Sequence, residues 1–527
     1  MEEGIFDDAT DQISQLPEPI LQHILSFLEV KEAIQMSVVS KTWNNAVAML
    51  HSLNYGDGSL FPVAKRNENE EAVFDKIREL LNGVESMIRK RQEQNVGVQK
   101  FCLRLSHSYK LLDLTPYIIR LTKELSACNI KELVFKVGTY RGKPCYTLPK
   151  AVYTWCSLHK LELGGFKLKL PSRGGIISLS SLRELRLYKT DMDHRVFQLL
   201  IMSCPELEFL SVDYCLGLDR LQIFGLLKLK EIRTRNCLQN FDKIQIQAPN
   251  LECLNHHGLG TLSLVDVNSC KSLKVLVLYS LTCDNKWVED LFCNLPLLEV
   301  FRLIGCDGLE MVKISSNHLK VLELDSCKNL VKTEVDAPLL SEFHYCGSLS
   351  VSLSIEAVAK ELVSLDIEQR TDEVLLNNEL VEFLQNFNHS KVIRLITGEL
   401  LKLSLAKDLC PPLYDVKHLT VNSDGVDKSK ILDLLDSLLW MAPCLDTLDL
   451  NLACDEKTVK FTRESPLIVE GVPCCPSVPF KCWHHTLKKV EFDNFENVED
   501  HWKLRNYFVE NAKILESIDG LIQCDRA

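Results

Sequence analysis

The stretch LEFLSVDYC (residues 207–215) returns in varied form as LKEIRTRNC (229–237), LEVFRLIGC (298–306) and LKVLELDSC (319–327). Each copy opens with leucine, carries mostly apolar residues at its fourth and sixth positions, and ends with cysteine. Because alternate residues of an extended chain point to opposite sides, this spacing marks one buried side of a short strand. Such a strand buries its apolar side only when neighbouring copies stack on it. The sequence therefore predicts a stack of similar units.

The spacing of the copies supports an array. Leu207, Leu229, Leu251 and Leu273 lie 22 residues apart, and further copies begin at residues 298, 319, 340 and 362. This pattern is the leucine-rich-repeat signature. Weaker copies occupy residues 98–103, 130–135, 158–163, 182–187, 416–421 and 445–450. We predict an α/β fold in which residues 98–453 form a leucine-rich-repeat solenoid, with a curved parallel sheet inside and helices or loops outside.

A second informative stretch, ISQLPEPILQHILSFLEVKEAIQMSVVSKTWNNAV (13–47), precedes the array. Its first apolar residues, from Leu16 to Leu28, recur at steps of three and four, so they line one face of a helix that Pro17 can open. Ser40 is the expected N-cap of a third helix that runs towards Met49. We predict three short helices within residues 10–50, with an apolar face that needs a partner to cover it.

The Leu-Pro at residue 16, the Ile-Leu-x-x-Leu at residue 24 and the Val-x-Ser-Lys-x-Trp at residue 38 together resemble the F-box. Two positions depart from that family: Glu29 stands where proline is common, and Asn44 stands beside the tryptophan where basic residues are common. The resemblance implies binding to the Skp-type adaptor of a cullin-RING ubiquitin ligase, which reaches the cullin and RING subunits through that adaptor. The expected adaptor-binding residues are Leu16, Pro17, Ile20, Ile24, Leu25, Leu28, Val38 and Trp43.

The segments that flank the array should cap its apolar ends. We expect residues 51–97 to be a linker with a loop (55–70) and an amphipathic capping helix (71–94). Residues 454–482 contain four prolines and are expected to be an irregular loop. Residues 483–527 should form a last strand and a helix capped by Asp500. That final segment resembles the FBD region that closes many plant F-box/leucine-rich-repeat proteins.

Composition excludes several classes of protein. The chain of 527 residues carries a formal net charge of −12, so nucleic-acid binding is not expected. It has no apolar run of about eighteen residues, so no membrane span is predicted. The basic run at residues 89–91 is expected to be a solvated helix end. The acidic N-terminus is unlike a signal peptide, and we therefore expect a cytoplasmic and/or nuclear protein.

The 21 cysteines lack the compact spacing of a disulfide scaffold, and we expect them to be reduced and mostly buried in repeats. One group has some metal-ligand character, but its adjacent cysteines lack C-x-x-C geometry, so no metal or cofactor is predicted. No phosphate loop, H-E-x-x-H motif or nucleophile elbow is present, so we predict a non-enzymatic protein. The metal-like group consists of Cys474, Cys475, Cys482, His484 and His485.

Side chains that flank the buried leucines should face the concave, solvent side of the array. They change from arginine-rich to carboxylate-rich near residue 310, which suggests a substrate with complementary charge of both signs. The alternative is that they are ordinary solvated positions. The expected substrate-binding residues are Arg186, Tyr188, Arg233, Arg235, His257, Tyr279, Arg302, Glu323, Asp325 and Asp366.

Taken together, the two resemblances and the array predict a substrate-recognition subunit of an SCF-type ubiquitin ligase. The F-box would bind the Skp-type adaptor and the solenoid would bind an unknown protein for ubiquitination. Two other functions stay open. One is a small-molecule, hormone-like co-receptor on the same architecture, which would require a concave pocket lined by the arginines named above. The other is an F-box/leucine-rich-repeat scaffold that works outside a ligase.

Overall fold

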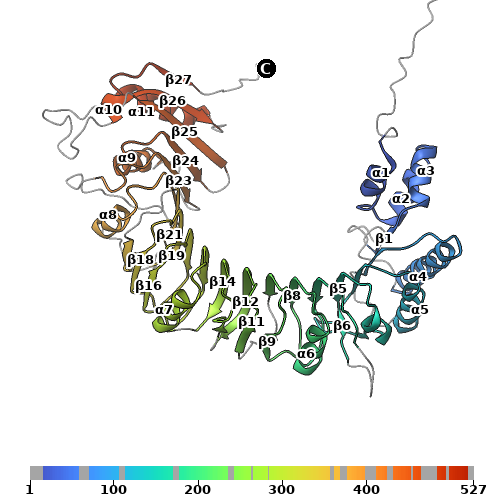
Figure 1. Cartoon of the computed structure of the whole chain (residues 1–527). Helices are drawn as coiled ribbons and strands as arrows, with labels where there is room; N and C mark the ends of the chain where they lie inside the picture. Colours follow the sequence, from blue (N-terminus) through green and yellow to red (C-terminus); the bar gives the residue numbers. More distant parts are fainter. Residues whose placement is uncertain are drawn as a thin grey trace, which may run out of the picture. The chain divides into compact units, whose positions relative to one another are not determined.

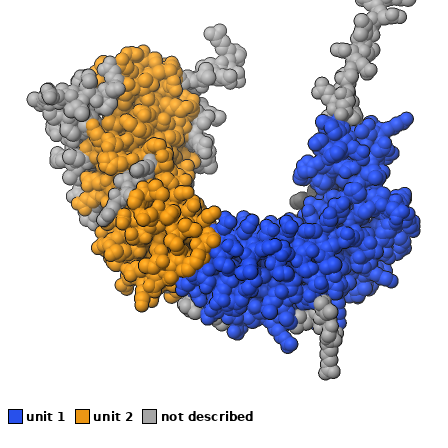
Figure 2. All heavy atoms as spheres, viewed as in Figure 1, with its two compact units in different colours: residues 1–270 blue, residues 271–527 orange. Residues whose placement is uncertain are grey.

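The computed structural model divides the chain into two compact units, residues 1–270 and 271–527 (Figures 1 and 2). Three short helices begin unit 1, and rows of parallel strands follow in both units (Figure 1). The predicted α/β class is therefore confirmed. The structure describes residues 16–57, 70–105, 113–169, 177–235, 243–262, 265–282, 284–355, 361–367, 377–397, 411–423, 431–452, 455–463, 483–493 and 498–519.

The three N-terminal helices are α1 (Glu18–Leu25), α2 (Val30–Met36) and α3 (Lys41–Ala48). Helix α3 begins as predicted, because the hydroxyl oxygen of Ser40 accepts a hydrogen bond from the backbone N–H of Trp43 at 3.3 Å. The helices enclose a small core of their own, which half-buried neighbours extend. The buried core residues are Leu21, Leu25, Ala33, Trp43, Ala46 and Leu50.

One parallel sheet runs through unit 1, and each strand hydrogen-bonds to the next in space. The apolar residues of the repeat signature point to its buried side, as Leu185 and Leu187 do in β7, whereas the residues between them reach solvent. The strands predicted from the repeats are thus confirmed. They are β2 (Lys100–Leu105), β3 (Glu132–Val137), β5 (Lys160–Gly164), β7 (Glu184–Tyr188), β8 (Phe209–Asp213), β10 (Glu231–Arg235) and β12 (Cys253–Leu262).

The sheet of unit 1 begins earlier in the chain than the sequence indicated. Strand β1 (Ser52–Gly56) pairs in parallel with β2, with Ser52 opposite Lys100. The sequence placed these residues in a linker, because only Leu53 and Tyr55 alternate there and so short a pattern was not recognised. The F-box segment therefore leads directly into the first strand of the sheet.

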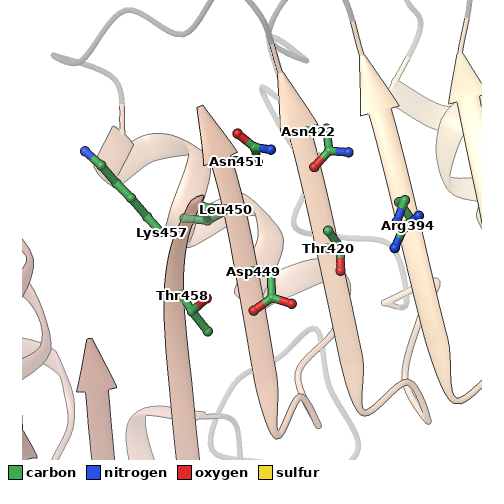
Figure 3. Close-up of a pocket in the computed structure, with 8 residues that line it drawn as sticks. All are labelled: Arg394, Thr420, Asn422, Asp449, Leu450, Asn451, Lys457 and Thr458. Carbon is green, nitrogen blue, oxygen red and sulfur yellow. The ribbon is translucent and has the colours of Figure 1, made fainter. Parts of the chain in front are cut away.

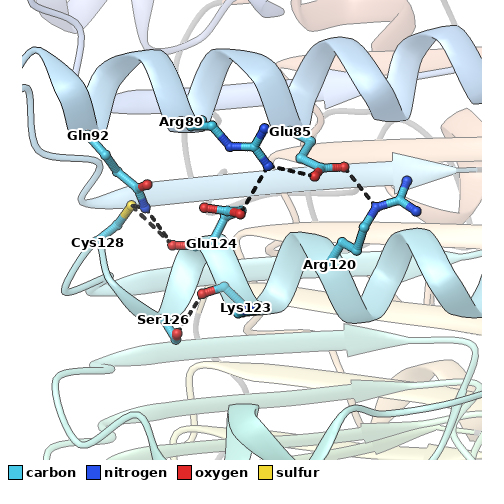
Figure 4. Close-up of polar contacts among 8 residues, drawn as sticks. All are labelled: Glu85, Arg89, Gln92, Arg120, Lys123, Glu124, Ser126 and Cys128. Atoms are coloured by element: carbon cyan, nitrogen blue, oxygen red, sulfur yellow. Dashed lines mark hydrogen bonds and ion pairs between the residues drawn. The ribbon is translucent and has the colours of Figure 1, made fainter.

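Helix α4 (Glu70–Glu93) follows β1, as the amphipathic pattern predicted, and it packs beside α5 (Thr115–Ser126). The buried side chains of Ile77 and Ile88 supply the apolar side of α4. Polar contacts join the exposed sides of the two helices (Figure 4). Glu85 accepts hydrogen bonds from Arg89 and Arg120, both at 3.0 Å, and Arg89 also reaches Glu124 at 3.2 Å.

Arg91 corrects the prediction that residues 89–91 are a solvated helix end. Its side chain is 7% exposed, and its guanidinium donates hydrogen bonds to the backbone carbonyls of Val47, at 3.2 Å, and of Leu50. These carbonyls lie at the C-terminal end of α3, where helical carbonyls lack partners within the helix. Arg91 therefore fastens the three-helix segment to α4.

Glu29 makes a second junction between the helices and the sheet. Its backbone N–H donates to the carboxylate of Glu32 at 2.9 Å, which closes a capping box at the start of α2. The Glu29 carboxylate lies close to Gly56 of β1, and a Cβ atom at that position would push the carboxylate aside. The position that departs from the family pattern thus has a structural role in this chain.

Unit 2 repeats the same parallel arrangement, and its buried residues again alternate with solvent-facing ones. Strand β25 (Asp455–Arg463) corrects one prediction, because the sequence placed its residues in an irregular loop. Its Val459 and Phe461 side chains alternate and are buried. The parallel strands are β14 (Val275–Leu281), β15 (Val300–Ile304), β17 (Val321–Asp325), β19 (Glu342–Gly347), β21 (Leu362–Ile367), β22 (Val392–Thr397), β23 (His418–Ser423) and β24 (Thr447–Leu452).

The C-terminal end of unit 2 departs from the repeat. Strands β25 (Asp455–Arg463) and β26 (Leu487–Asp493) pair antiparallel, and β27 (Ser517–Asp519) then pairs in parallel with β26. Helix α11 (Val498–Asn511) begins two residues before Asp500, so Asp500 lies inside the helix and is not its cap. The predicted last strand is confirmed as β26, but β27 follows it.

Two repeat positions were misread. The first is in β21, where Val363 pairs with Phe343 of the preceding strand β19. The buried residues of β21 are therefore Val363 and Leu365, and Leu362 does not occupy the position of the earlier leucines. Strand β22 was missed, because its repeat carries Ser390 where the others carry leucine, although that serine is buried as they are.

The return segments between the main strands contain more strand than expected. Short parallel ladders form alongside the predicted helices, so the outer side is not only helix and loop. The ladders are β9 (Arg220–Phe224), β11 (Lys243–Gln247) and β13 (Val265–Asp266); β16 (Met311–Ser315), β18 (Lys332–Asp336) and β20 (Ser352–Ile355); and β4 (Tyr146–Thr147) with β6 (Phe166–Lys167). The remaining helices are a 3-10 helix (Lys150–Thr154), α6 (His194–Met202), α7 (Asn285–Asn294), α8 (Asn377–Gln385), α9 (Ile431–Met441) and α10 (Trp483–Thr486).

Candidate protein-interaction surfaces

The three-helix segment leaves large apolar side chains in solvent although its core is complete without them. Phe27 is 71% exposed and Val38 is 86% exposed, and both follow helices whose opposite sides are buried. Ile20 and Ile24, one turn apart on α1, and Ile34 on α2 are exposed as well. Exposed apolar groups in such number mark a surface that another protein covers. We call Ile20, Ile24, Phe27, Ile34 and Val38 the apolar face of the F-box segment.

The structure divides the eight predicted adaptor-binding residues into two groups. Pro17, Ile20, Ile24 and Val38 are exposed, and Leu16 and Leu28 are half-buried against the core. Leu25 and Trp43 are 0% and 2% exposed, because they fill the centre of the three-helix core. The prediction that these two side chains contact an adaptor is therefore corrected: they support the surface from below.

On the solvent-facing side of unit 1, Phe209 lies between two arginines from neighbouring strands. The guanidinium of Arg186 lies 4.5 Å from the centre of the Phe209 ring, and that of Arg233 lies 5.6 Å from it. Each arginine also pairs with a glutamate of its own strand, Glu184 or Glu231. These contacts hold two long side chains in defined positions around an aromatic ring.

A second aromatic group lies on the same side of unit 1. The rings of Tyr188 and Tyr214 meet edge to face with their centres 5.7 Å apart. The ammonium groups of Lys189 and Lys136 lie 5.0 and 5.6 Å from the Tyr188 ring. Half-buried aromatic rings with cations beside them are the residue types that dominate binding energy in protein interfaces.

Arg235 and His257 occupy the next positions, as register neighbours on β10 and β12. Beneath them lies a buried polar pair, in which Thr234 and His256 replace two of the leucines that the repeat signature expects. The Thr234 hydroxyl is 2.5 Å from the Nδ1 atom of His256. Burial, reinforced by the neighbouring His257, lowers the pKa of His256 to about 4.

In unit 2, the predicted residues continue along the solvent-facing side, with Tyr279, Asp325 and Asp366 half-buried there. Arg302 and Glu323 are register neighbours and form an ion pair at 3.2 Å. This pair lies where the sequence suggested that arginines give way to carboxylates. Arg186, Arg233 and Arg302 are each paired with a carboxylate. These pairs do not support a surface that is divided into one arginine-rich and one carboxylate-rich region.

Among the residues that the structure describes, no three His, Cys, Asp or Glu side chains lie close enough together to hold a metal ion. His484 and His485 lie on α10, whereas the cysteines predicted beside them lie outside the described residues. Cys215, at the repeat position, is buried, and burial raises the pKa of its thiol to about 11. Within the described segments, no helix is both long and apolar enough to cross a membrane.

Sequence reasoning missed several residues of these surfaces. Phe209 and Tyr214 were not named, although Phe209 has the same alternation relative to Leu210 that selected its neighbours. Arg394 was missed because the strand that carries it, β22, was not recognised. The contacts of Arg186 and Arg233 with Phe209 join residues from neighbouring repeats, so only the register between strands reveals them.

Comparison with known families identifies both parts of the chain. Residues 13–55 match the F-box domain family, and residues 119–263 match the leucine-rich repeats of the FBD-associated F-box protein At5g56370. Residues 261–524, half of the chain, match the family described as the At1g61320/AtMIF1 leucine-rich-repeat domain. The chain belongs to the plant F-box/leucine-rich-repeat family. Proteins of this family are typically non-catalytic adaptors, in which the F-box domain implies binding to a Skp-type adaptor and the repeats imply protein interaction.

Full-length relatives share this F-box/leucine-rich-repeat organisation. F-box/LRR-repeat protein 13 of Arabidopsis thaliana is 24% identical over 450 residues, which are 82% of this chain and 94% of that protein. F-box/FBD/LRR-repeat protein At1g78750 of the same plant is 24% identical over 442 residues, 81% and 93% of the two chains. F-box/LRR-repeat protein At2g42730, also from Arabidopsis thaliana, is 30% identical over 270 residues; that match spans 48% of this chain and about half, 53%, of the relative.

Proposed function

We propose that the chain is the substrate-recognition subunit of an SCF-type ubiquitin ligase. The F-box segment would bind the Skp-type adaptor and, through it, the cullin and RING subunits. The sheet would hold the protein to be ubiquitinated, and ubiquitin transfer would belong to the partners. We further propose that it works in the cytoplasm, the nucleus or both.

The observation that carries this proposal is the apolar face of the F-box segment. A valine that is 86% exposed beside a complete core contributes nothing to folding, and covering it stabilises a complex. A standard protein interface removes about 1,600 Å² from water in total, and a few central apolar anchors supply most of its binding energy. Phe27, Ile24 and Val38 are residues of that kind.

The way the F-box segment is attached also suits a ligase subunit. Arg91 holds the helices against α4, the Glu29 carboxylate lies close to Gly56 of β1, and β1 is itself a strand of the sheet. A protein held on the sheet would therefore keep a defined position relative to a bound adaptor. Such positioning serves ubiquitin transfer, which needs the acceptor close to the enzyme that carries ubiquitin.

The solvent-facing side of unit 1 is the proposed place of substrate contact. Phe209, Tyr188 and Tyr214 provide aromatic area. Arg186 and Arg233 lie against the Phe209 ring, and Lys136 and Lys189 lie against the Tyr188 ring. Replacing Phe209 by Ala should weaken capture of the substrate and leave adaptor binding unchanged. Unchanged capture by Phe209→Ala, and by Arg233→Glu combined with Arg235→Glu, would place the substrate elsewhere.

Reconstituted ubiquitination tests the proposal. The full chain is assembled with a Skp-type adaptor, cullin and RING subunits, and proteins cross-linked to it in plant extract are supplied with ubiquitin and its activating and conjugating enzymes. We expect ubiquitin on proteins captured by the native chain. A Phe27→Asp, Val38→Asp double variant should capture the same proteins but leave them unmodified.

A matched control is Met202→Asp on α6, because Met202 is also apolar and is 70% exposed, but lies outside the F-box segment. It should behave as the native chain does. If the native chain binds the adaptor but captured proteins never receive ubiquitin, the protein is a ligase-independent scaffold. The co-receptor alternative requires a pocket lined by Arg186, Arg233, Arg235 and Arg302; of these, Arg186, Arg233 and Arg302 pair with carboxylates.

A further inference from the structure

A polar pocket lies on the solvent-facing side of unit 2, where four neighbouring strands, β22 to β25, supply its walls (Figure 3). Its volume is about 190 Å³. Arg394 of β22 and Thr420 of β23 are register neighbours, and Thr420 is in turn opposite Asp449 of β24. The side chains of Arg394, Thr420 and Asp449 therefore project from the same side of the sheet.

Arg394 is the feature that gives the pocket its chemical preference. It is exposed, and within the described part of the chain it has neither an ion pair nor a hydrogen-bond partner. Other arginines on solvent-facing strand positions differ, since Arg302 of unit 2 pairs with Glu323 at 3.2 Å, and Arg186 and Arg233 of unit 1 pair with glutamates of their own strands. A guanidinium offers five N–H donors in a planar fork that matches a carboxylate. Arg394 thus keeps this capacity for a ligand.

Two amide side chains line the same pocket (Figure 3). Asn422 and Asn451 are register neighbours on β23 and β24, and both are half-buried. Neither makes a hydrogen bond to another described residue. Each amide can donate two hydrogen bonds and accept others, so the pair offers donors to a molecule in the pocket. Half-buried polar groups without partners bind well to a ligand that satisfies them.

The one carboxylate in the pocket is already engaged. Oδ2 of Asp449 lies 2.6 Å from Nε2 of His418, which is on the neighbouring strand β23. This contact holds Asp449 in place, so Arg394 remains the uncommitted charge. A second cation, Lys457, is buried in the wall at 7% exposure. A singly charged anion therefore suits the site, whereas Asp449 disfavours a doubly charged phosphate.

The size of the pocket limits the occupant. Sites for whole drug-sized ligands measure roughly 300 to 1,000 Å³, and a cavity of about 150 Å³ holds benzene. A volume of about 190 Å³ therefore accepts one side chain or one chain end, not a larger molecule. The rest of such a segment would lie along the open side of the sheet.

We infer that this pocket binds a carboxylate of the captured protein, which is either an acidic side chain or a free C-terminus. Arg394 supplies the charge, and Asn422 and Asn451 supply the flanking hydrogen bonds. This inference rests on the proposed function, because it assumes that the sheet holds a protein. It adds a second contact, in unit 2, to the aromatic contacts proposed for unit 1.

A peptide array tests the inference with the full-length chain as the binding protein. The probes are decapeptides of randomised sequence whose central residue is fixed as Glu, Asp, Gln, Lys or phosphoserine. Each set is made with a free and with an amidated C-terminus, which separates recognition of a side chain from recognition of the chain end. Arg394→Gln removes the charge but keeps an amide of similar reach, and Arg183→Gln is the matched control for an exposed arginine outside the pocket.

We expect peptides with a central Glu or Asp, or with a free C-terminus, to bind at least about tenfold better than the Gln and Lys sets. Arg394→Gln should remove this preference, and Arg183→Gln should keep it. The inference is wrong if no set binds above the Arg394→Gln background, if the preference survives that substitution, or if phosphoserine is preferred to Glu. Thermal unfolding confirms that each variant is folded.

Adaptor binding by the same variants separates this inference from the proposed function. Arg394→Gln should bind the Skp-type adaptor as the native chain does, because Arg394 lies in unit 2 and the F-box in unit 1. If adaptor binding is native and carboxylate preference is absent, the pocket inference fails alone. If the native chain does not bind the adaptor, the proposed function fails whatever the array shows.

Discussion

The guanidinium of Arg91, near the end of α4, donates a hydrogen bond to the backbone carbonyl of Val47, near the end of α3, at 3.2 Å. The same side chain also reaches the carbonyl of Leu50. One residue therefore satisfies two carbonyls at the end of the F-box segment and ties that segment to the helix that follows β1.

Removing this contact should loosen the F-box segment. Arg91→Ala removes the hydrogen bonds to the carbonyls of Val47 and Leu50, of which Val47 keeps the backbone N–H of Leu50 as a donor, and a hydrogen bond to a charged group contributes roughly 2 kcal/mol. We expect faster amide hydrogen exchange in residues 41–57 and a lower free energy of unfolding for that region. Arg89→Ala is the control, because its exposed ion pairs contribute little. Equal protection in native chain and Arg91→Ala would contradict the assigned role.

The F-box core and the F-box surface should respond differently to substitution. Trp43→Ala empties the centre of the three-helix core and should cost about 3 to 5 kcal/mol, which is enough to unfold so small a segment. Val38→Asp changes a side chain that is 86% exposed and should leave the fold intact. Amide hydrogen exchange of residues 16–50 in the full chain measures the difference. Native protection in Trp43→Ala, or lost protection in Val38→Asp, would reverse this assignment.

His256 should make the chain less stable in mild acid. Its pKa is lowered from 6.5 to about 4 in the folded protein, so the folded state resists protonation that the unfolded state accepts. The stabilisation is complete above pH 6.5 and is lost progressively as the pH falls towards 4, for a total of roughly 3 kcal/mol.

Urea unfolding at a series of pH values measures this dependence. His256→Leu restores the leucine of the repeat signature and removes the titrating group. The slope of stability against pH between 4 and 6.5 should therefore be smaller in His256→Leu than in the native chain. Identical slopes would show that His256 does not control the acid response.

Cysteine reactivity should follow burial. A thiol reacts as the thiolate, and burial raises the pKa of Cys215 to about 11 and that of Cys204 to about 12. Brief alkylation of the native protein at pH 8 should label the exposed Cys145 and Cys156 and spare Cys215 and Cys204. Mass spectrometry of the peptides measures the labelling. Early modification of Cys215 would show that its repeat opens to solvent.

The parts of the fold that sequence predicted are those in which one residue type recurs at a fixed spacing. The leucines of β8, β10, β15 and β17 identify their strands, because each burial position repeats in the next unit. Strands without that regularity were lost: β1 is followed by the long helix α4 and not by another repeat, and β22 has Ser390 at the leucine position.

The interaction surfaces were less predictable, because they depend on contacts between repeats and between distant segments. The alternation along a strand correctly indicated which residues reach solvent, such as Arg186 and Arg233. It did not indicate that these arginines pair with glutamates and enclose Phe209. Periodicity likewise could not separate Trp43, which supports the F-box surface, from Val38, which forms it.

The affinity between the purified full-length chain and a purified Skp-type adaptor, measured by titration calorimetry, tests the central claim most directly. We expect the native chain and Met202→Asp to bind equally, and Val38→Asp to bind at least about tenfold more weakly, because a charge would enter the apolar contact. No binding by the native chain, or equal binding by Val38→Asp, would contradict the claim that the apolar face of the F-box segment is the adaptor-binding surface.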